Sequence, residues 1–181
     1  MKNSLILAFV LFTISSFAQP ANSINQDDNK AKIKIVQVLK AETSDFYAND
    51  YEAWKSNWSQ SENSVTAWNN LDGTYRYIRG WSEINKVYKE MITNQTEESH
   101  PDFNVGNLNI DINGNLAYVV YDEYVANSDN KFSKVPVVKT LKKVNGQWKL
   151  HSVISYWDRN YQYKKEEVKE FIAGNGFDQY K

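Results

Sequence analysis

The sequence contains no cysteine among its 181 residues. It can therefore form no disulfide and offers neither a thiol nucleophile nor a thiolate metal ligand. Histidine is also scarce, because only His100 and His151 are present and they lie far apart in the chain. A Gly-rich phosphate loop, a nucleophile elbow and a paired His-Glu helix motif are all missing. We therefore expect no metal site and no cofactor.

An excess of charge of either sign is missing too. The chain has 21 basic and 22 acidic residues, for a net charge of −1, and its basic residues form no stripe. Nucleic acid is therefore not expected as a partner. Hydrophobic residues make up 41% of the chain and charged residues 24%, which is typical of a globular protein. The length is that of one domain.

Only one long hydrophobic run occurs, at the N-terminus. Lys2 precedes an apolar run from Leu5 to Phe12, and Ser16-Phe17-Ala18 places small residues before a cleavage site. This pattern predicts a signal peptide over residues 1–18, cleaved after Ala18, and hence a secreted or periplasmic protein. An uncleaved membrane anchor is the alternative, although the run is shorter than the ~20 residues of a bilayer span. After cleavage we expect no membrane association.

Helical patterns fill the first half of the mature chain. Residues 19–32 are polar and are predicted to be a flexible leader. Apolar residues then recur at helical spacing, which predicts a helix over residues 33–48. Asp50 is a good N-cap for a second, short helix over residues 51–58.

Two short strands are expected next, over residues 64–68 and 74–79. Gly80 then opens a third helix, for which Ser82 is the expected cap. The apolar stripe of that helix comprises Ile84, Val87, Tyr88 and Met91.

The second half has the pattern of a sheet. Asn113-Gly114 and Asn145-Gly146 each separate two apolar runs, which is a strong hairpin signal. The two hairpins predict a four-stranded meander, followed by a C-terminal helix and tail over residues 161–181. Helices segregated from a sheet indicate an α+β domain. We expect a strongly curved antiparallel sheet, wrapped around the three helices and enclosing a cavity.

Four sequence motifs, in this order along the chain, resemble those of the nuclear-transport-factor-2-like (SnoaL-like) superfamily. They are "FYANDYEAW" from Phe46, "GWSEINKVYKEM" from Gly80, "GNLAYVVYDEY" from Gly114 and "VNGQWKLHSVISYW" from Val144. The resemblance implies a cone-shaped domain over residues 33–160 with a pocket between sheet and helices. The superfamily includes isomerases, cyclases, dehydratases, binding proteins and association domains, so the fold does not settle the function.

The catalytic set of the family's ketosteroid isomerases is missing. Its carboxylate base would fall near Ala67, its tyrosine near Glu42 and its aspartic acid near Val137 to Lys139. Cyclases and dehydratases of this fold use Asp and His in the pocket. Alternation from Trp148 places His151 on the outer face of the last strand, and His100 lies in a polar loop.

Two carboxylates are the remaining candidates for chemistry. Asp122 and Glu123 interrupt a central strand that is apolar on both faces, so either could point inward, where burial would raise its pKa. By analogy with the family, Glu123 is the expected inner residue. Trp54 and Trp58 are expected in the core, and Trp68 and Trp81 near the mouth of the cavity.

Three functions remain open. The first is a non-catalytic pocket protein for a small, partly apolar or aromatic molecule. Its expected lining residues are Trp68, Tyr121, Glu123, Ser152 and Tyr156. The second is a SnoaL-like lyase, isomerase or hydrolase with Glu123 or Asp122 as general base. The third is an association module that forms a homodimer through the sheet.

Overall fold

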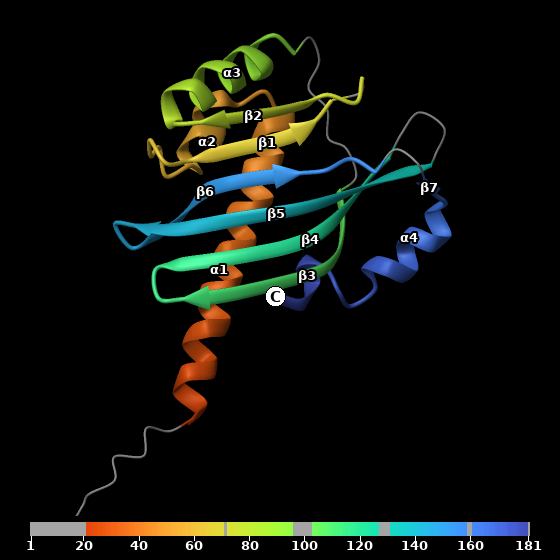
Figure 1. Ribbon diagram of the computed structural model, residues 1–181. Helices are drawn as coiled ribbons and strands as arrows, with labels where there is room; N and C mark the ends of the chain where they lie inside the picture. The colour runs from red at the N-terminus through yellow and green to blue at the C-terminus, as the bar shows by residue number, and fades with distance from the viewer. Residues whose placement is uncertain (1–20, 71, 96–102, 127–130, 159–160, 181) are drawn as a thin grey trace, which may run out of the picture.

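A computed structural model describes residues 21–70, 72–95, 103–126, 131–158 and 161–180 (Figure 1). The predicted signal peptide, residues 1–18, and His100 lie outside these ranges. No helix of the described ranges has the length and apolar character needed to cross a membrane. In chain order the elements are α1 (Ala21–Tyr47), α2 (Tyr51–Ser56), β1 (Val65–Asn69), β2 (Tyr75–Arg79), α3 (Trp81–Thr93), β3 (Phe103–Asn113), β4 (Leu116–Ala126), β5 (Phe132–Val144), β6 (Gln147–Ser155), β7 (Gln162–Tyr163), α4 (Lys165–Ile172) and the 3₁₀ turn η1 (Phe177–Tyr180).

The predicted α+β architecture is confirmed. One sheet has the strand order β2-β1-β6-β5-β4-β3, with β7 beside β5. Strands β3 to β6 form the expected antiparallel meander. The prediction of an antiparallel sheet is wrong at one place, because β1 pairs with β6 in parallel. Parallel neighbours need a long connection, and α3 and four strands separate these two along the chain.

The two hairpin turns differ in detail. Asn145 and Gly146 both have positive φ, 50° and 80°, as the Asn-Gly signal predicts. In the first hairpin Asn113 pairs with Leu116, so the turn lies one residue later than predicted. Gly114, with a φ of 60°, then takes the first turn position.

Helix α1 begins earlier than the sequence pattern predicts. It starts at Ala21, so residues 21–32 are helical and not the flexible leader that was expected. No glycine or proline follows Pro20 in this stretch, and a polar helix can extend beyond the sheet, as Figure 1 shows. The predicted cap of α2 is confirmed, since the Asp50 carboxylate accepts a 2.9 Å hydrogen bond from the Ala53 N–H.

The predicted cap of α3 is wrong. The helix starts at Trp81, one residue before Ser82, and Gly80 is the N-cap without a side-chain hydrogen bond. Gly80 has a φ of 90°, a conformation that a residue with a Cβ rarely adopts. The apolar stripe is also shifted, because Ile92 is fully buried whereas Met91 is 40% exposed.

Helix α1 crosses one face of the sheet, here called the inner face (Figure 1). The core lies between them and continues into α2, whose Trp54 is fully buried, and into Trp58 just beyond it. The prediction that these two tryptophans belong to the core is therefore confirmed. They form an aromatic cluster with Trp81 and Tyr88, and the Trp54 and Tyr88 rings stack with centroids 4.6 Å apart.

The last residues of the chain wrap around the free edge of β3. Helix α4 contacts β3, and residues 173–180, here called the C-terminal segment, continue past it. The Leu108 N–H donates to the Asn175 carbonyl at 2.9 Å, where an irregularity interrupts the pairing of β3 with β4. An edge strand that would otherwise expose unpaired backbone groups is thus covered.

The closest approach of this segment depends on Gly176. A Cβ placed there would lie 2.2 Å from the Val105 carbonyl oxygen, so a side chain forces the backbones apart. We predict that Gly176→Ala destabilises the fold by about 1–3 kcal/mol, as overpacking does, and speeds hydrogen exchange at the Leu108 amide. The exposed substitution Gln179→Ala is the control and should do neither. Unchanged exchange at Leu108 in Gly176→Ala would contradict this role.

Candidate functional site

A bulge in β6 decides which residues of that strand face inward. Thr140 pairs with Ser152, but Leu141 pairs with Leu150, so His151 is an extra residue. Beyond the bulge the alternation is reversed: Val153 packs against the core, whereas Tyr156 is 63% exposed.

Ser152 and Tyr156 are therefore not lining residues of the interior, contrary to the prediction. The Ser152 hydroxyl lies 2.7 Å from that of Thr140. Tyr156 borders a shallow depression that it shares with Asp122 and Ile154. The count from Trp148 failed because sequence alternation does not reveal a bulge.

The orientation of the two carboxylates on β4 is resolved. Tyr121 and Glu123 point to the inner face, and Glu123 borders two cavities there. Asp122 points the other way and forms an ion pair with Lys134 at 2.9 Å. The Asn107 amide also donates to Asp122 at 2.8 Å. The expected inner residue, Glu123, is thus the one that the structure places inside.

A buried ion pair connects α1 to β5. The Lys139 ammonium group donates to Oε2 of Glu42 at 2.9 Å, and Trp54 Nε1 donates to the other oxygen at 3.3 Å. Lys139 also hydrogen-bonds Tyr121, whose hydroxyl donates to Oε1 of Glu123 at 3.0 Å. These contacts join Trp54, Glu42, Lys139, Tyr121 and Glu123 in one network, here called the lysine network.

The lysine network contains one ammonium group and two carboxylates. Burial alone would lower the pKa of Lys139, but Glu42, Tyr121 and Glu123 together raise that pKa well above its usual value. Burial raises the pKa of Glu123, and the charge of Glu42 adds to this, while Lys139 and Tyr121 oppose it. The pKa of Tyr47 is raised by burial and by the Glu123 charge.

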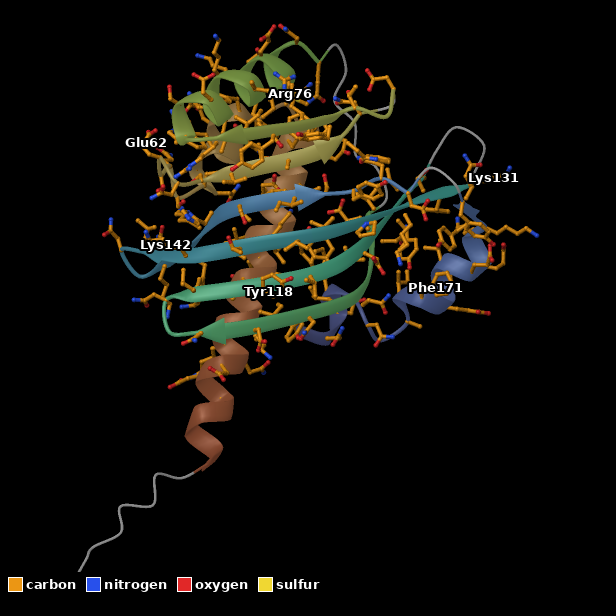
Figure 2. The ribbon with its side chains drawn as sticks, in the orientation of Figure 1. Glu62, Arg76, Tyr118, Lys131, Lys142 and Phe171 are labelled. Atoms are coloured by element: carbon orange, nitrogen blue, oxygen red, sulfur yellow. The ribbon has the colours of Figure 1, made fainter. Side chains whose placement is uncertain are left out.

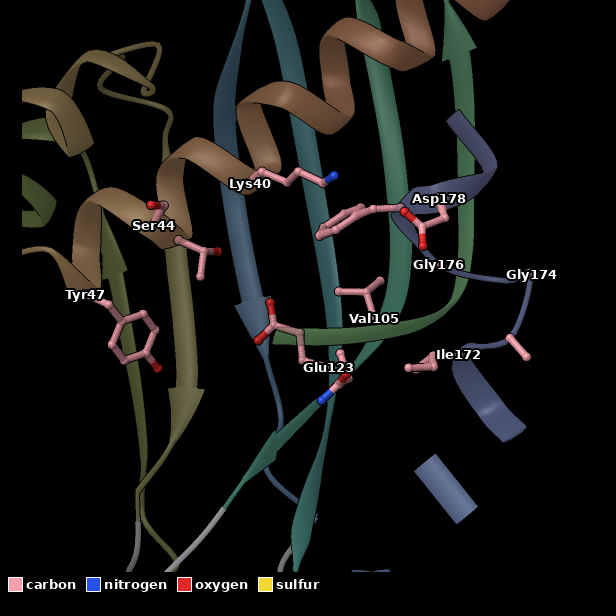
Figure 3. Close-up of a pocket in the computed structure, with 13 residues that line it drawn as sticks. Lys40, Ser44, Tyr47, Val105, Glu123, Ile172, Gly174, Gly176 and Asp178 are labelled. Atoms are coloured by element: carbon pink, nitrogen blue, oxygen red, sulfur yellow. The ribbon is translucent and has the colours of Figure 1, made fainter. Parts of the chain in front are cut away.

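The main chamber is a cavity of about 550 Å³ beside this network. It lies between α1, strands β3 and β4 and the C-terminal segment, and Figure 3 shows Glu123 and Tyr47 bordering it. Its lining residues are Lys40, Thr43, Ser44, Tyr47, Asn104, Val105, Glu123, Ile172, Ala173, Gly174, Gly176, Phe177 and Asp178. A second cavity of about 140 Å³, the inner chamber, shares Thr43, Tyr47 and Glu123 with it and reaches Glu42 and Lys139.

The two tryptophans expected at the cavity mouth are elsewhere. Trp81 packs on Trp54, with ring centroids 6.2 Å apart. Trp68 lies edge-on to Tyr88, and its indole N–H donates to Asn70 at 3.1 Å. Both come from the β1–β2 end of the sheet, whereas the main chamber lies at the β3 end.

Sequence reasoning missed most of the chamber lining. Lys40, Thr43, Ser44 and Tyr47 are spaced as one face of a helix, so the predicted first helix could have indicated them. No pattern indicated that residues 172–178 form the facing wall. His151 stays outside the chambers, with Nδ1 3.2 Å from the Ser59 hydroxyl, and burial and Lys142 lower its pKa. Within the described ranges no three acidic or histidine side chains are placed to hold a metal ion.

The comparisons with known proteins identify the fold. No protein-family model matches the sequence, and no curated protein matches it either. An NTF-2-like protein of unknown function from Shewanella oneidensis is similar in structure, with a TM-score of 0.53 and 18% identity over 68% of this chain and 96% of that one. A candidate dehydratase of the NTF2-like family from Streptomyces avermitilis has a TM-score of 0.56 and 15% identity, over 74% and 98%.

A candidate ketosteroid isomerase from Parabacteroides distasonis is also similar, with a TM-score of 0.52 and 16% identity over 70% of this chain and 86% of that one. The chain therefore has the nuclear-transport-factor-2-like fold, as its four sequence motifs predicted. At these identities the similarity concerns the fold alone and does not assign an activity.

The ion pair yields a prediction for stability. Lys139→Met and Glu42→Leu each leave a buried charge unpaired and should lower the free energy of unfolding by about 3–5 kcal/mol. The double variant should lose clearly less than the sum of the two, as measured by urea denaturation. Lys134→Met, on the same strand but with a side chain 27% exposed, is the control and should cost about 1 kcal/mol or less. If the double variant lost the sum of the two single losses in free energy of unfolding, Lys139 and Glu42 would not be coupled, which would contradict the prediction.

The raised pKa of Glu123 predicts a pH dependence. A carboxyl whose pKa is higher in the folded state stabilises the fold below its unfolded pKa, and this contribution is lost as pH rises through the folded pKa. Glu123→Gln should therefore gain stability relative to the wild type between pH 4 and pH 7, by about 1.4 kcal/mol per unit of pKa difference. The free energy of unfolding is measured by chemical denaturation at pH 4 and at pH 7. The control Glu90→Gln, on the exposed face of α3, should show no such gain between these two pH values.

Proposed function

We propose that this protein is exported and binds a small, partly apolar molecule in the main chamber. The observation that carries the proposal is the chamber itself. Its volume of about 550 Å³ lies within the range of small-molecule sites, roughly 300–1,000 Å³. Val105, Ile172 and Phe177 give it apolar walls, and Glu123 and Lys40 supply polar groups that can fix the orientation of a ligand.

The residues around the chamber support binding without turnover. By the resemblance to ketosteroid isomerases, their base would fall near Ala67, and their two acid donors near Glu42 and near Val137 to Lys139. Glu42 and Lys139 are bonded to each other, so neither presents a proton to a substrate in the way those donors do.

A second candidate is an enzyme with Glu123 as its general base. The raised pKa of Glu123 and its place beside a cavity favour this alternative, because catalytic carboxylates are tuned by burial in the same way. Asp122 is no longer a candidate for this role, since it lies on the opposite face of the sheet in its ion pair with Lys134.

A third candidate is a homodimer formed through the outer face of the sheet. Strand register places an apolar row across that face, and Ile154 and Tyr77 in it are 44% and 57% exposed. The row comprises Tyr77, Ala67, Ile154, Val138 and Val120. A self-complementary apolar row suits a two-fold interface, so a second copy of the chain is the proposed partner.

Native mass spectrometry of the protein, isolated gently from its own host, tests these proposals together. We expect a mass excess of a few hundred daltons on the mature chain. Ser44→Trp places a large ring at the chamber wall and should remove this excess. Ser56→Trp, an exposed serine on α2, is the matched control and should keep it.

Each result has a definite meaning. The same excess in Ser44→Trp would place the molecule outside the main chamber and overturn the proposal. A bound molecule that the protein converts on incubation, but Glu123→Gln does not, would favour the enzyme. A dimer without bound molecule would favour the association module.

A further inference from the structure

The two carboxylates of the lysine network are not equally neutralised. Glu42 accepts from both Lys139 and Trp54. Glu123 accepts only the Tyr121 hydroxyl, on Oε1, and its Oε2 has no hydrogen-bond partner among the described residues. Glu123 lines both chambers, so its carboxylate borders the space that a bound molecule would occupy.

Neither lysine beside the chambers forms its closest contact with Glu123. Lys139 is 2.9 Å from Glu42. Lys40 lies over the ring of Phe177, with Nζ 5.3 Å from the ring centroid, and in the described part of the chain it forms no ion pair with Glu123. The lysine network contains one ammonium group and two carboxylates, so it has a net negative charge when Glu123 is ionised.

Aromatic side chains line the main chamber together with the Glu123 carboxylate. Tyr47 and Phe177 line the main chamber together with Glu123 (Figure 3). Tyr121 lies beneath them, and its ring centroid is 6.1 Å from that of Phe177. A carboxylate among aromatic faces is a combination that attracts ammonium groups, through a charge-assisted hydrogen bond and through cation–π contact.

We infer that the main chamber selects organic ammonium compounds, with the cationic head at Glu123 and the apolar body along Val105 and Ile172. This inference rests on the proposed function, because it names the class of molecule that the same chamber holds. A carboxylate head would instead be repelled by the ionised Glu123, and could be held in this chamber only at Lys40. A neutral head would leave the negative charge of Glu123 uncompensated.

Three fluorescent probes with the same dansyl body test the head group. Dansylcadaverine ends in an ammonium group, its N-acetyl derivative is neutral, and dansyl-6-aminohexanoate ends in a carboxylate. Titration of the whole protein at pH 7 should show the ammonium probe binding about tenfold or more tighter than the neutral one, and the carboxylate weakest. A charge-assisted hydrogen bond is of this size.

Variants assign the preference to its residues. Glu123→Gln should weaken the ammonium probe about tenfold and leave the neutral probe within about twofold. Asp122→Asn, on the outer face of the same strand, is the matched control and should change neither.

The failures are distinguishable. If the three probes bind equally, or if Glu123→Gln keeps the ammonium preference, the inference on ligand class is overturned while binding in the chamber stands. If none of the probes binds, the proposed function fails, and this inference fails with it.

Discussion

Lys139 is the residue on which the arrangement of the interior depends. Its side chain points from the middle of β5 into the core, where it is 3% exposed, and an ammonium group without a partner there would cost several kcal/mol. Glu42 on α1 supplies the partner, and Trp54 on α2 orients the Glu42 carboxylate. The ion pair thus connects α1 directly to the sheet and α2 through Trp54. Figure 2 shows the side chains on the helices and the sheet, with Tyr118 of β4 and Lys142 of β5 among those labelled.

The chamber follows from this constraint. Burial raises the pKa of Glu123 at the chamber wall, and Lys139, which is paired with Glu42, opposes this rise only in part. The C-terminal segment closes the opposite wall, and Gly176 lets it approach the β3 backbone closely enough to bring Phe177 over Tyr121. The charged side of the chamber, at Glu123, and its apolar side, at Phe177, therefore come from segments that are far apart in the sequence.

The fold could be predicted from local patterns, and the site only in part. Asn-Gly turns, the Asp50 cap and helical periodicity act within a few residues, so they revealed the meander and the helices. Glu123 was found because a charge in an apolar strand is conspicuous. The bulge at His151 is set by strand pairing and not by local sequence, which is why Ser152 and Tyr156 were placed on the wrong face. The contact between Glu42 and Lys139 spans 97 positions, and no local pattern indicates it.

The central claim is that Glu123 is the chamber carboxyl left without its own cation. Titration of its side-chain carboxyl carbon by nuclear magnetic resonance tests this most directly. The account predicts a midpoint above the ordinary value of 4.5, and a further rise in Lys139→Met, which removes the opposing charge while the fold is kept under stabilising conditions. A midpoint at or below 4.5 in the wild-type protein would contradict it, because a cation would then neutralise this carboxylate despite its burial.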